Sequence, residues 1–160
     1  MDELEQRVHD AAAATGAPFR AMPCDSALAD TAEFCAHYGI APEDTANTIV
    51  VASKSDPVQY VACLVLATTR LDVNGVVRKR MGARKVSFAS AEITTQVTGM
   101  VMGGVTVFGL PDTMPVWVDS AVMQRTEIVV GGGSRAMKIV TSPDALLKLQ
   151  NVEVVDDLAS

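Results

Sequence analysis

Two dense runs of apolar, largely β-branched residues lie near the middle of the chain, at residues 48–52 and 58–67. A polar segment at residues 53–57, which ends in the pair Asp56-Pro57, separates them. Runs of this length and composition are typical of buried strands, and an Asp-Pro pair favours a turn. The pattern therefore predicts an antiparallel hairpin at the centre of a sheet.

Apolar residues three or four positions apart predict the helices. Three of these helices follow a Ser or Asp that can cap a helix, and each ends at a glycine. The predicted helices cover residues 3–14, 26–38, 73–81 and 91–97, and a last one is opened by Ser142. A short helical segment beginning at Pro42 leads into the strand at 48–52, so Asn47 lies at a helix-to-strand junction.

Shorter apolar segments predict further strands at residues 18–24, 85–88, 115–119, 126–130 and 136–140. A strand-loop-strand arrangement is also expected through residues 99–111. No internal repeat or low-complexity linker interrupts this order, and 160 residues of which 49% are hydrophobic suffice for a substantial core. We expect one domain, residues 1–160, of mixed α/β (α+β) class.

Glycine is concentrated in two segments, residues 99–111 and 131–135. Without a Cβ, glycine adopts positive φ and lets the main chain approach a ligand closely. The two segments either converge on a pocket lined by main-chain donors and acceptors, or are tight connections and bulges between strands. The sequence leaves both interpretations open.

Composition excludes several classes of site and location. Three separated cysteines and two histidines do not fit a disulfide framework, a thiolate zinc site, a three-histidine metal site or a Ser-His-Asp triad. Neither glycine segment has the spacing of a dinucleotide or phosphate loop, so we expect no cofactor. No apolar run approaches the ~20 residues of a membrane helix, and the first residues are acidic, which favours a cytoplasmic protein without membrane contact.

The net charge of −6 argues against broad nucleic-acid binding, but one basic cluster stands out. It consists of Arg78, Lys79, Arg80, Arg84 and Lys85. The cluster is either a solvated helix face or a set of phosphate contacts.

Four segments in this order make the chain resemble the YbaK/EbsC family, the prolyl-tRNA synthetase-associated editing domain. They are residues 46–51, where a helix meets a strand, residues 70–74, which open a helix after the hairpin, the glycine segment 98–109, and residues 129–146. The resemblance covers about residues 25–157. It implies a mixed, barrel-like β-sheet flanked by helices.

The resemblance also implies an activity: hydrolysis, by a free-standing enzyme, of the ester that joins a wrong amino acid to the 3′ end of a tRNA. The implied partners are aminoacylated tRNA and an aminoacyl-tRNA synthetase. Oriented water and oxyanion donors suffice for such an activated ester. The basic cluster is then the contact to the tRNA backbone, and the implied substrate-binding residues are Gly103, Gly104, Val105, Thr106, Val107, Gly131, Gly132, Gly133, Ser134 and Arg135.

The chain departs from the family pattern at two positions. Asn47 occupies the place of the family's catalytic lysine, and Val107 occupies the place of the proline in its Gly-x-x-x-Pro loop. An amide hydrogen-bonds but carries no charge, and valine does not fix φ. Lys54 and Arg135 are the two candidate cations that could replace the missing lysine. Lys54 is the poorer candidate, because seven residues of strand span about 23 Å.

Three functions remain compatible with the sequence. The first is a deacylase that removes a small amino acid, such as Ala, Ser, Cys, Thr or Pro, from a mischarged tRNA. The second is a noncatalytic module that binds aminoacyl-tRNA or an amino acid and has lost the family lysine. The third is a hydrolase of another small ester or thioester.

Overall fold

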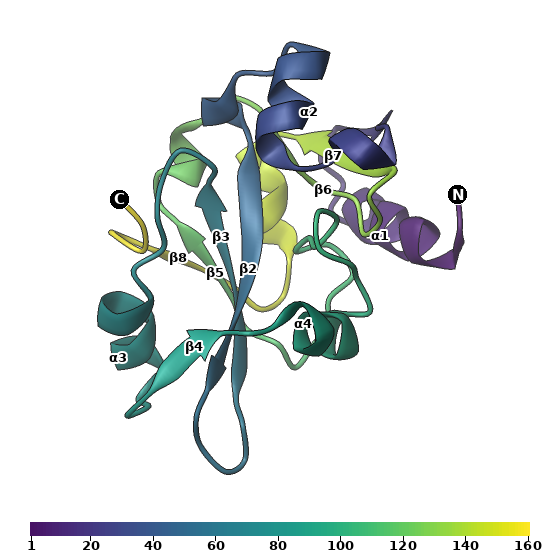
Figure 1. Cartoon of the computed structure of the whole chain (residues 1–160). Helices are drawn as coiled ribbons and strands as arrows, with labels where there is room; N and C mark the ends of the chain where they lie inside the picture. The colour runs from purple at the N-terminus through teal and green to yellow at the C-terminus, as the bar shows by residue number, and fades with distance from the viewer.

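The computed structural model describes residues 1–160, which form an α/β fold with two β-sheets and flanking helices. Figure 1 shows the larger sheet at the centre and the smaller one beside α1 and α2. The larger sheet has the strand order β4-β2-β3-β5-β8, and the smaller has the order β1-β7-β6. The strands are β1 Phe19–Pro23, β2 Ala46–Ser53, β3 Tyr60–Leu66, β4 Val86–Phe88, β5 Val116–Asp119, β6 Ile128–Gly131, β7 Met137–Thr141 and β8 Val152–Val155.

The predicted central hairpin is confirmed. Strands β2 and β3 pair antiparallel from Ala46↔Leu66 to Ala52↔Tyr60, and the Asp56-Pro57 bond in the turn is cis. β3 pairs with β5 on its other side, in parallel. Six of its seven residues are buried, because alternate side chains pack into two different core groups on opposite faces of the sheet, which explains why its sequence is continuously apolar instead of alternating.

The helices follow the predicted caps. They are α1 Glu3–Ala14, α2 Thr31–Tyr38, α3 Arg78–Met81, which continues a π-helical turn at Val73–Val77, and α4 Ala91–Thr98. Gly39, Gly82 and Gly99 end the last three with φ of 68°, 66° and 74°. The predicted helix 26–38 is split: Asp25 caps a short 3₁₀ turn, Ser26–Leu28, and a new start at Asp30 begins α2. Short 3₁₀ segments also form at Pro42–Asp44, Val122–Gln124 and, in place of the last predicted helix, Pro143–Lys148.

The predicted mixed α/β class with flanking helices is confirmed, although the sheets do not close into a barrel. One isolated parallel bridge, Thr45↔Val129, links the residue before β2 to β6. The strands predicted within residues 99–111 are wrong. The glycine segment contains no strand, because positive φ at Gly103 and Gly109 interrupts extended backbone. Met100, Val105, Val107 and Phe108 are buried in an irregular loop, whereas Val101 and Met102 of the same segment are exposed. Strand β8 forms without having been predicted.

Three groups of buried side chains hold the layers together. The largest, with 20 buried residues, includes Val8 of α1, Phe108 of the glycine loop and Leu64 of β3. A second lies between the large sheet and α3, and a third lies between the small sheet and α2. None of the helices has the length and apolar composition needed to span a bilayer.

Candidate functional site

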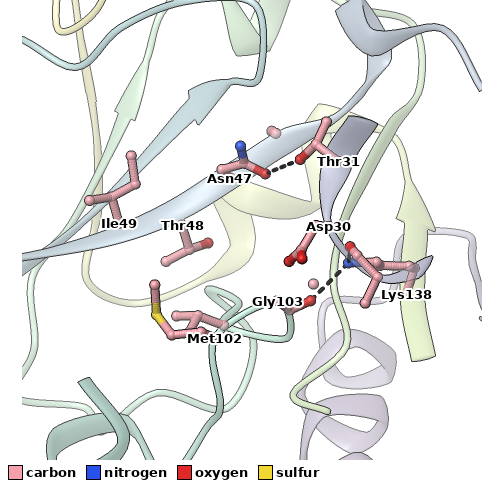
Figure 2. Close-up of a pocket in the computed structure, with 12 residues that line it drawn as sticks. Asp30, Thr31, Asn47, Thr48, Ile49, Met102, Gly103 and Lys138 are labelled. Carbon is pink, nitrogen blue, oxygen red and sulfur yellow. Dashed lines mark hydrogen bonds between the residues drawn. The ribbon is translucent and has the colours of Figure 1, made fainter. Parts of the chain in front are cut away.

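A cavity of ≈ 250 Å³ opens where the two sheets diverge (Figure 2). β2 and β6 touch at the Thr45↔Val129 bridge, and residues beyond it on both strands line the cavity. Twelve residues form its wall: Ala29, Asp30, Thr31, Ala46, Asn47, Thr48, Ile49, Met102, Gly103, Val105, Gly131 and Lys138. The cavity thus lies between two strand edges and is bordered by the glycine loop and the start of α2.

The wall formed by β2 is an open strand edge. At the two ends of the hairpin, the Thr45 carbonyl accepts from the Ala67 N–H and the Ser53 N–H donates to the Gln59 carbonyl, so the main-chain groups of odd-numbered residues of β2 face β3. Even-numbered residues face the other way, where β4 pairs only from Val51 to Ser53. Thr48 therefore lies on a stretch of this edge that β4 does not cover. The Thr48 hydroxyl is also buried without a hydrogen-bond partner.

The structure brings the two glycine segments together. The Gly133 N–H donates to the Gly104 carbonyl at 2.6 Å, and Gly103 and Gly131 both line the cavity. A Cβ on Gly131 would lie 2.3 Å from the carbonyl oxygen of Val105. This close main-chain contact is possible only without a side chain, so the glycines set the shape of the cavity wall.

Lys138 reaches the cavity from β7 and is only 8% exposed. Its Nζ donates to the carbonyls of Ala29 and Gly103, both at 2.9 Å, and lies 5.4 Å from the ring centre of Phe34. Its cross-strand partner is Gly131, which has no side chain to fill the space that the lysine crosses. Burial lowers the pKa of the Lys138 ammonium, because the charged form loses solvation.

An ion pair stands at the rim. Arg135 donates to both carboxylate oxygens of Asp30, and also to the carbonyls of Ser26 and Met102. The hydrogen bond from Arg135 lowers the pKa of Asp30, and the same bond raises the pKa of Arg135. Asp30 is therefore an ionised, exposed carboxylate beside the cavity, and the Arg135 guanidinium is hydrogen-bonded to it.

Asn47 is the second residue of β2 and lies in the cavity wall, as Figure 2 shows. Its Oδ1 accepts a hydrogen bond from the Thr31 hydroxyl at 3.3 Å, which links β2 to the first residue of α2. Lys54 lies in the exposed turn at the other end of β2 and does not line the cavity. Of the cationic side chains in the chain, only Lys138 is part of the wall.

Several predicted site residues support the wall without forming it. Gly104, Gly132 and Gly133 are buried main-chain contacts, and the Ser134 hydroxyl donates to Glu5 of α1. Thr106 and Val107 are buried behind the loop, whereas Val105 lines the cavity.

The structure places none of the predicted basic cluster in the wall. Arg80 pairs with Glu153 and lies 5.1 Å from the centre of the Trp117 ring.

Four residues of the wall, Asp30, Thr31, Thr48 and Lys138, were not predicted from the sequence. Asp30, Thr31 and Thr48 look like ordinary cap and strand residues, and only the fold brings them together. Lys138 carried a usable signal, because it is a single charge inside the apolar strand Met137–Thr141, whose other residues are buried. A lone lysine in such a strand is rarely buried without a role for its charge.

Nowhere do three or more His, Cys, Asp or Glu side chains gather in a way that holds a metal ion.

Lys138 is expected to make stability depend on pH in alkaline solution. Its pKa is lowered by folding, so between the folded value and the ordinary 10.5 the unfolded chain binds more protons than the folded one. The unfolding free energy therefore rises with pH across that window. Urea denaturation of wild type and Lys138→Met at increasing pH measures this, and the wild type should gain relative to the variant. Parallel pH curves would contradict a lowered pKa.

Comparison with known proteins identifies the class to which this fold and cavity belong. The family model for the aminoacyl-tRNA editing domain matches residues 25–149. The chain belongs to this family, which confirms the resemblance to YbaK/EbsC proteins.

Individual relatives are distant. EbsC of Enterococcus faecalis, provisionally named a Cys-tRNA(Pro)/Cys-tRNA(Cys) deacylase, is 27% identical over 103 residues, which is 64% of this chain and 60% of EbsC. A solved hypothetical protein has a TM-score of 0.84 at 23% identity, covering 96% of this chain and 99% of its own. A structure described as a candidate trans-editing enzyme for prolyl-tRNA synthetase has a TM-score of 0.82 at 20% identity, covering 98% and 97%. The two structures establish the shared fold.

Proposed function

We propose that the protein is a trans-editing aminoacyl-tRNA deacylase that hydrolyses the ester of a tRNA mischarged with a small amino acid. One observation carries the proposal: a small polar cavity lies between two open strand edges in a chain of the aminoacyl-tRNA editing family. The aminoacyl group occupies this cavity, and the tRNA end enters at the rim.

The polar groups of the cavity suit the parts of an aminoacyl ester. The α-amino group, which is partly protonated near neutral pH, meets the Asp30 carboxylate. The hydroxyl of Thr48, which has no hydrogen-bond partner in the protein, provides a donor and an acceptor for the carbonyl and for the attacking water. Orientation of water against an activated ester is the main requirement for its hydrolysis.

Cavity size sets the expected selectivity. A space of ≈ 250 Å³ must hold the amino-acid side chain, the ester and a water molecule, which favours small residues. Small amino acids are also those that synthetases separate poorly, because one methylene is worth only about 1–3 kcal/mol. The candidates remain Ala, Ser, Cys, Thr and Pro.

The test is release of radiolabelled amino acid from a panel of preloaded tRNAs, including cognate and mischarged pairs, by the wild-type protein. We expect turnover with at least one small amino acid and none with Phe or Trp above the rate without protein. Failure to release any amino acid from any tRNA would overturn the proposed function.

A noncatalytic binding module is the second candidate, and Asn47 favours it, because an uncharged amide occupies the place of the family lysine. Asn47→Lys separates the two. If the wild type binds aminoacyl-tRNA without hydrolysis and Asn47→Lys gains activity, the natural protein is a binder. If the wild type already hydrolyses the ester, the binding-only function is excluded.

We also propose that the exposed side chains of the basic cluster contact tRNA phosphates. Lys79, Arg84 and Lys85 are exposed, whereas Arg80 is engaged by Glu153. Each phosphate contact that is lost should reduce the slope of log K against log salt by about 0.7–0.9. Binding of tRNA by Lys79→Gln and Arg84→Gln, titrated at several salt concentrations, tests this. The exposed Lys148→Gln is the matched control and should leave the slope unchanged.

A further inference from the structure

The Lys138 ammonium is a fixed, partly used donor in the cavity wall. An ammonium has three N–H donors, and the carbonyls of Ala29 and Gly103 accept two of them. No third protein acceptor is present for its Nζ. Because the two acceptors belong to different segments, the group is held from two sides, and its remaining N–H is free for a ligand in the cavity.

The surroundings of this ammonium strengthen its interaction with a negative oxygen. The lysine is 8% exposed, and Phe34 covers it on the α2 side. A charge interacts more strongly in such a partly desolvated position than in water. Asp30 is the one carboxylate in the cavity wall, and it is already paired with Arg135. It therefore only partly offsets the positive charge of Lys138.

The other cations are poorly placed for this role. Arg135 donates to Asp30 and to the carbonyls of Ser26 and Met102, so its guanidinium is committed to the rim. Lys54 lies beyond the opposite end of β2. Asn47 supplies an amide without charge. Lys138 is therefore the cation that a bound carbonyl group meets inside the cavity.

We propose that Lys138 is a catalytic residue that stabilises the oxyanion formed during ester hydrolysis; this inference rests on the proposed function. The water oxygen bonds to the ester carbonyl carbon, and the electron pair of the C=O bond moves onto the carbonyl oxygen. The third N–H of Lys138 donates to that oxygen. The intermediate then collapses, the bond from carbon to the ribose oxygen breaks, and a proton from the attacking water ends on that ribose oxygen.

This role differs from one in which Lys138 only ties the Ala29 turn to the Gly103 loop. If Lys138 only holds these two segments together, its removal distorts the cavity and therefore weakens substrate binding and lowers stability. An oxyanion donor acts mainly in the transition state, so its removal lowers the rate of hydrolysis while ground-state binding changes little.

The experiment compares wild type, Lys138→Met and the surface control Lys148→Met in single-turnover hydrolysis and in binding of the tRNA that the wild type deacylates fastest. Methionine keeps an unbranched side chain and removes the charge. We expect the rate of Lys138→Met to fall about 10²–10³-fold, with a Kd within about threefold of wild type. A rate within threefold of wild type, or a rate loss matched by an equal loss of binding, would overturn the proposal. Wild-type protein without any activity would instead overturn the proposed function and, with it, this role.

A second measurement keeps the proposal testable if Lys138→Met does not fold. The Lys138 ammonium of the wild type, labelled with ¹³C-lysine, is titrated by NMR with and without a phosphonate analogue of the aminoacyl-adenosine ester. The anionic phosphonate stands in for the oxyanion and should raise the pKa of Lys138. A phosphonate that binds without changing this titration would overturn the assignment.

Discussion

Gly131→Ala is expected to lower the free energy of unfolding by about 3 kcal/mol and to abolish substrate binding in the cavity. The new Cβ would lie 2.3 Å from the Val105 carbonyl oxygen and 2.8 Å from that of Gly104, and main-chain atoms have no rotamer with which to avoid it. Overpacking of this kind costs about 1–3 kcal/mol, with the upper end expected where only backbone can yield. Separation of β6 from the glycine loop would also displace Gly103.

Urea denaturation and aminoacyl-tRNA binding measure the two effects. Gly82→Ala is the control, because its Cβ meets nothing within 4 Å and the substitution costs only the strain of a positive φ, about 1 kcal/mol. If both alanine variants lose the same stability, the close contact at Gly131 does not determine the cavity shape.

Thr31→Trp is expected to reduce deacylation at least 100-fold while leaving the fold intact. Thr31 is the first residue of α2, half-buried at the edge of the cavity, and its hydroxyl donates to Asn47. An indole at this position fills the space that the aminoacyl group needs, and displacement of a reacting group by about 1 Å already costs about 100-fold. Because Thr31 is half-buried at the cavity edge and not in the core, the cost to stability should stay below that of core overpacking, about 1–3 kcal/mol.

The deacylation rate measures the effect on the cavity, and the midpoint of thermal unfolding measures the effect on the fold. Glu33→Trp introduces the same indole on the same helix at an exposed residue outside the cavity wall, so it should retain wild-type activity. A fully active Thr31→Trp would mean that the aminoacyl group binds elsewhere. Equal losses of deacylation rate in both variants would mean that the indole disturbs helix α2 and does not act by filling the cavity.

The hairpin and most helix ends were predictable because their signals are local. The β-branched runs of β2 and β3 and the glycines that end α2, α3 and α4 act through neighbouring residues. The strand expected in the glycine segment failed for a tertiary reason. Val105 and Val107 are apolar because the loop is packed inside the molecule, and burial alone gives the same composition as a strand.

The site was predictable only in part, because it is made of contacts between distant segments. The two glycine segments indicated where the main chain comes close to other atoms, and Asn47, named as a candidate from the resemblance, lies in the wall of the cavity. The position of Lys138 depends on two carbonyls that are 109 and 35 residues away along the chain, and no spacing rule includes such partners. The open edge of β2 likewise depends on where β4 stops pairing.

Under the proposed function, the angle between the two sheets at the Thr45↔Val129 bridge would be a determinant of selectivity. A wedge that widens from one fixed point changes its aperture with small rotations about that point. Residues packed behind the bridge, such as Val129 with Phe34 and Cys35, would then adjust the size of amino acid accepted without touching it. In the proposed enzyme, substrate preference would depend as much on the packing that sets this angle as on the side chains that line the cavity.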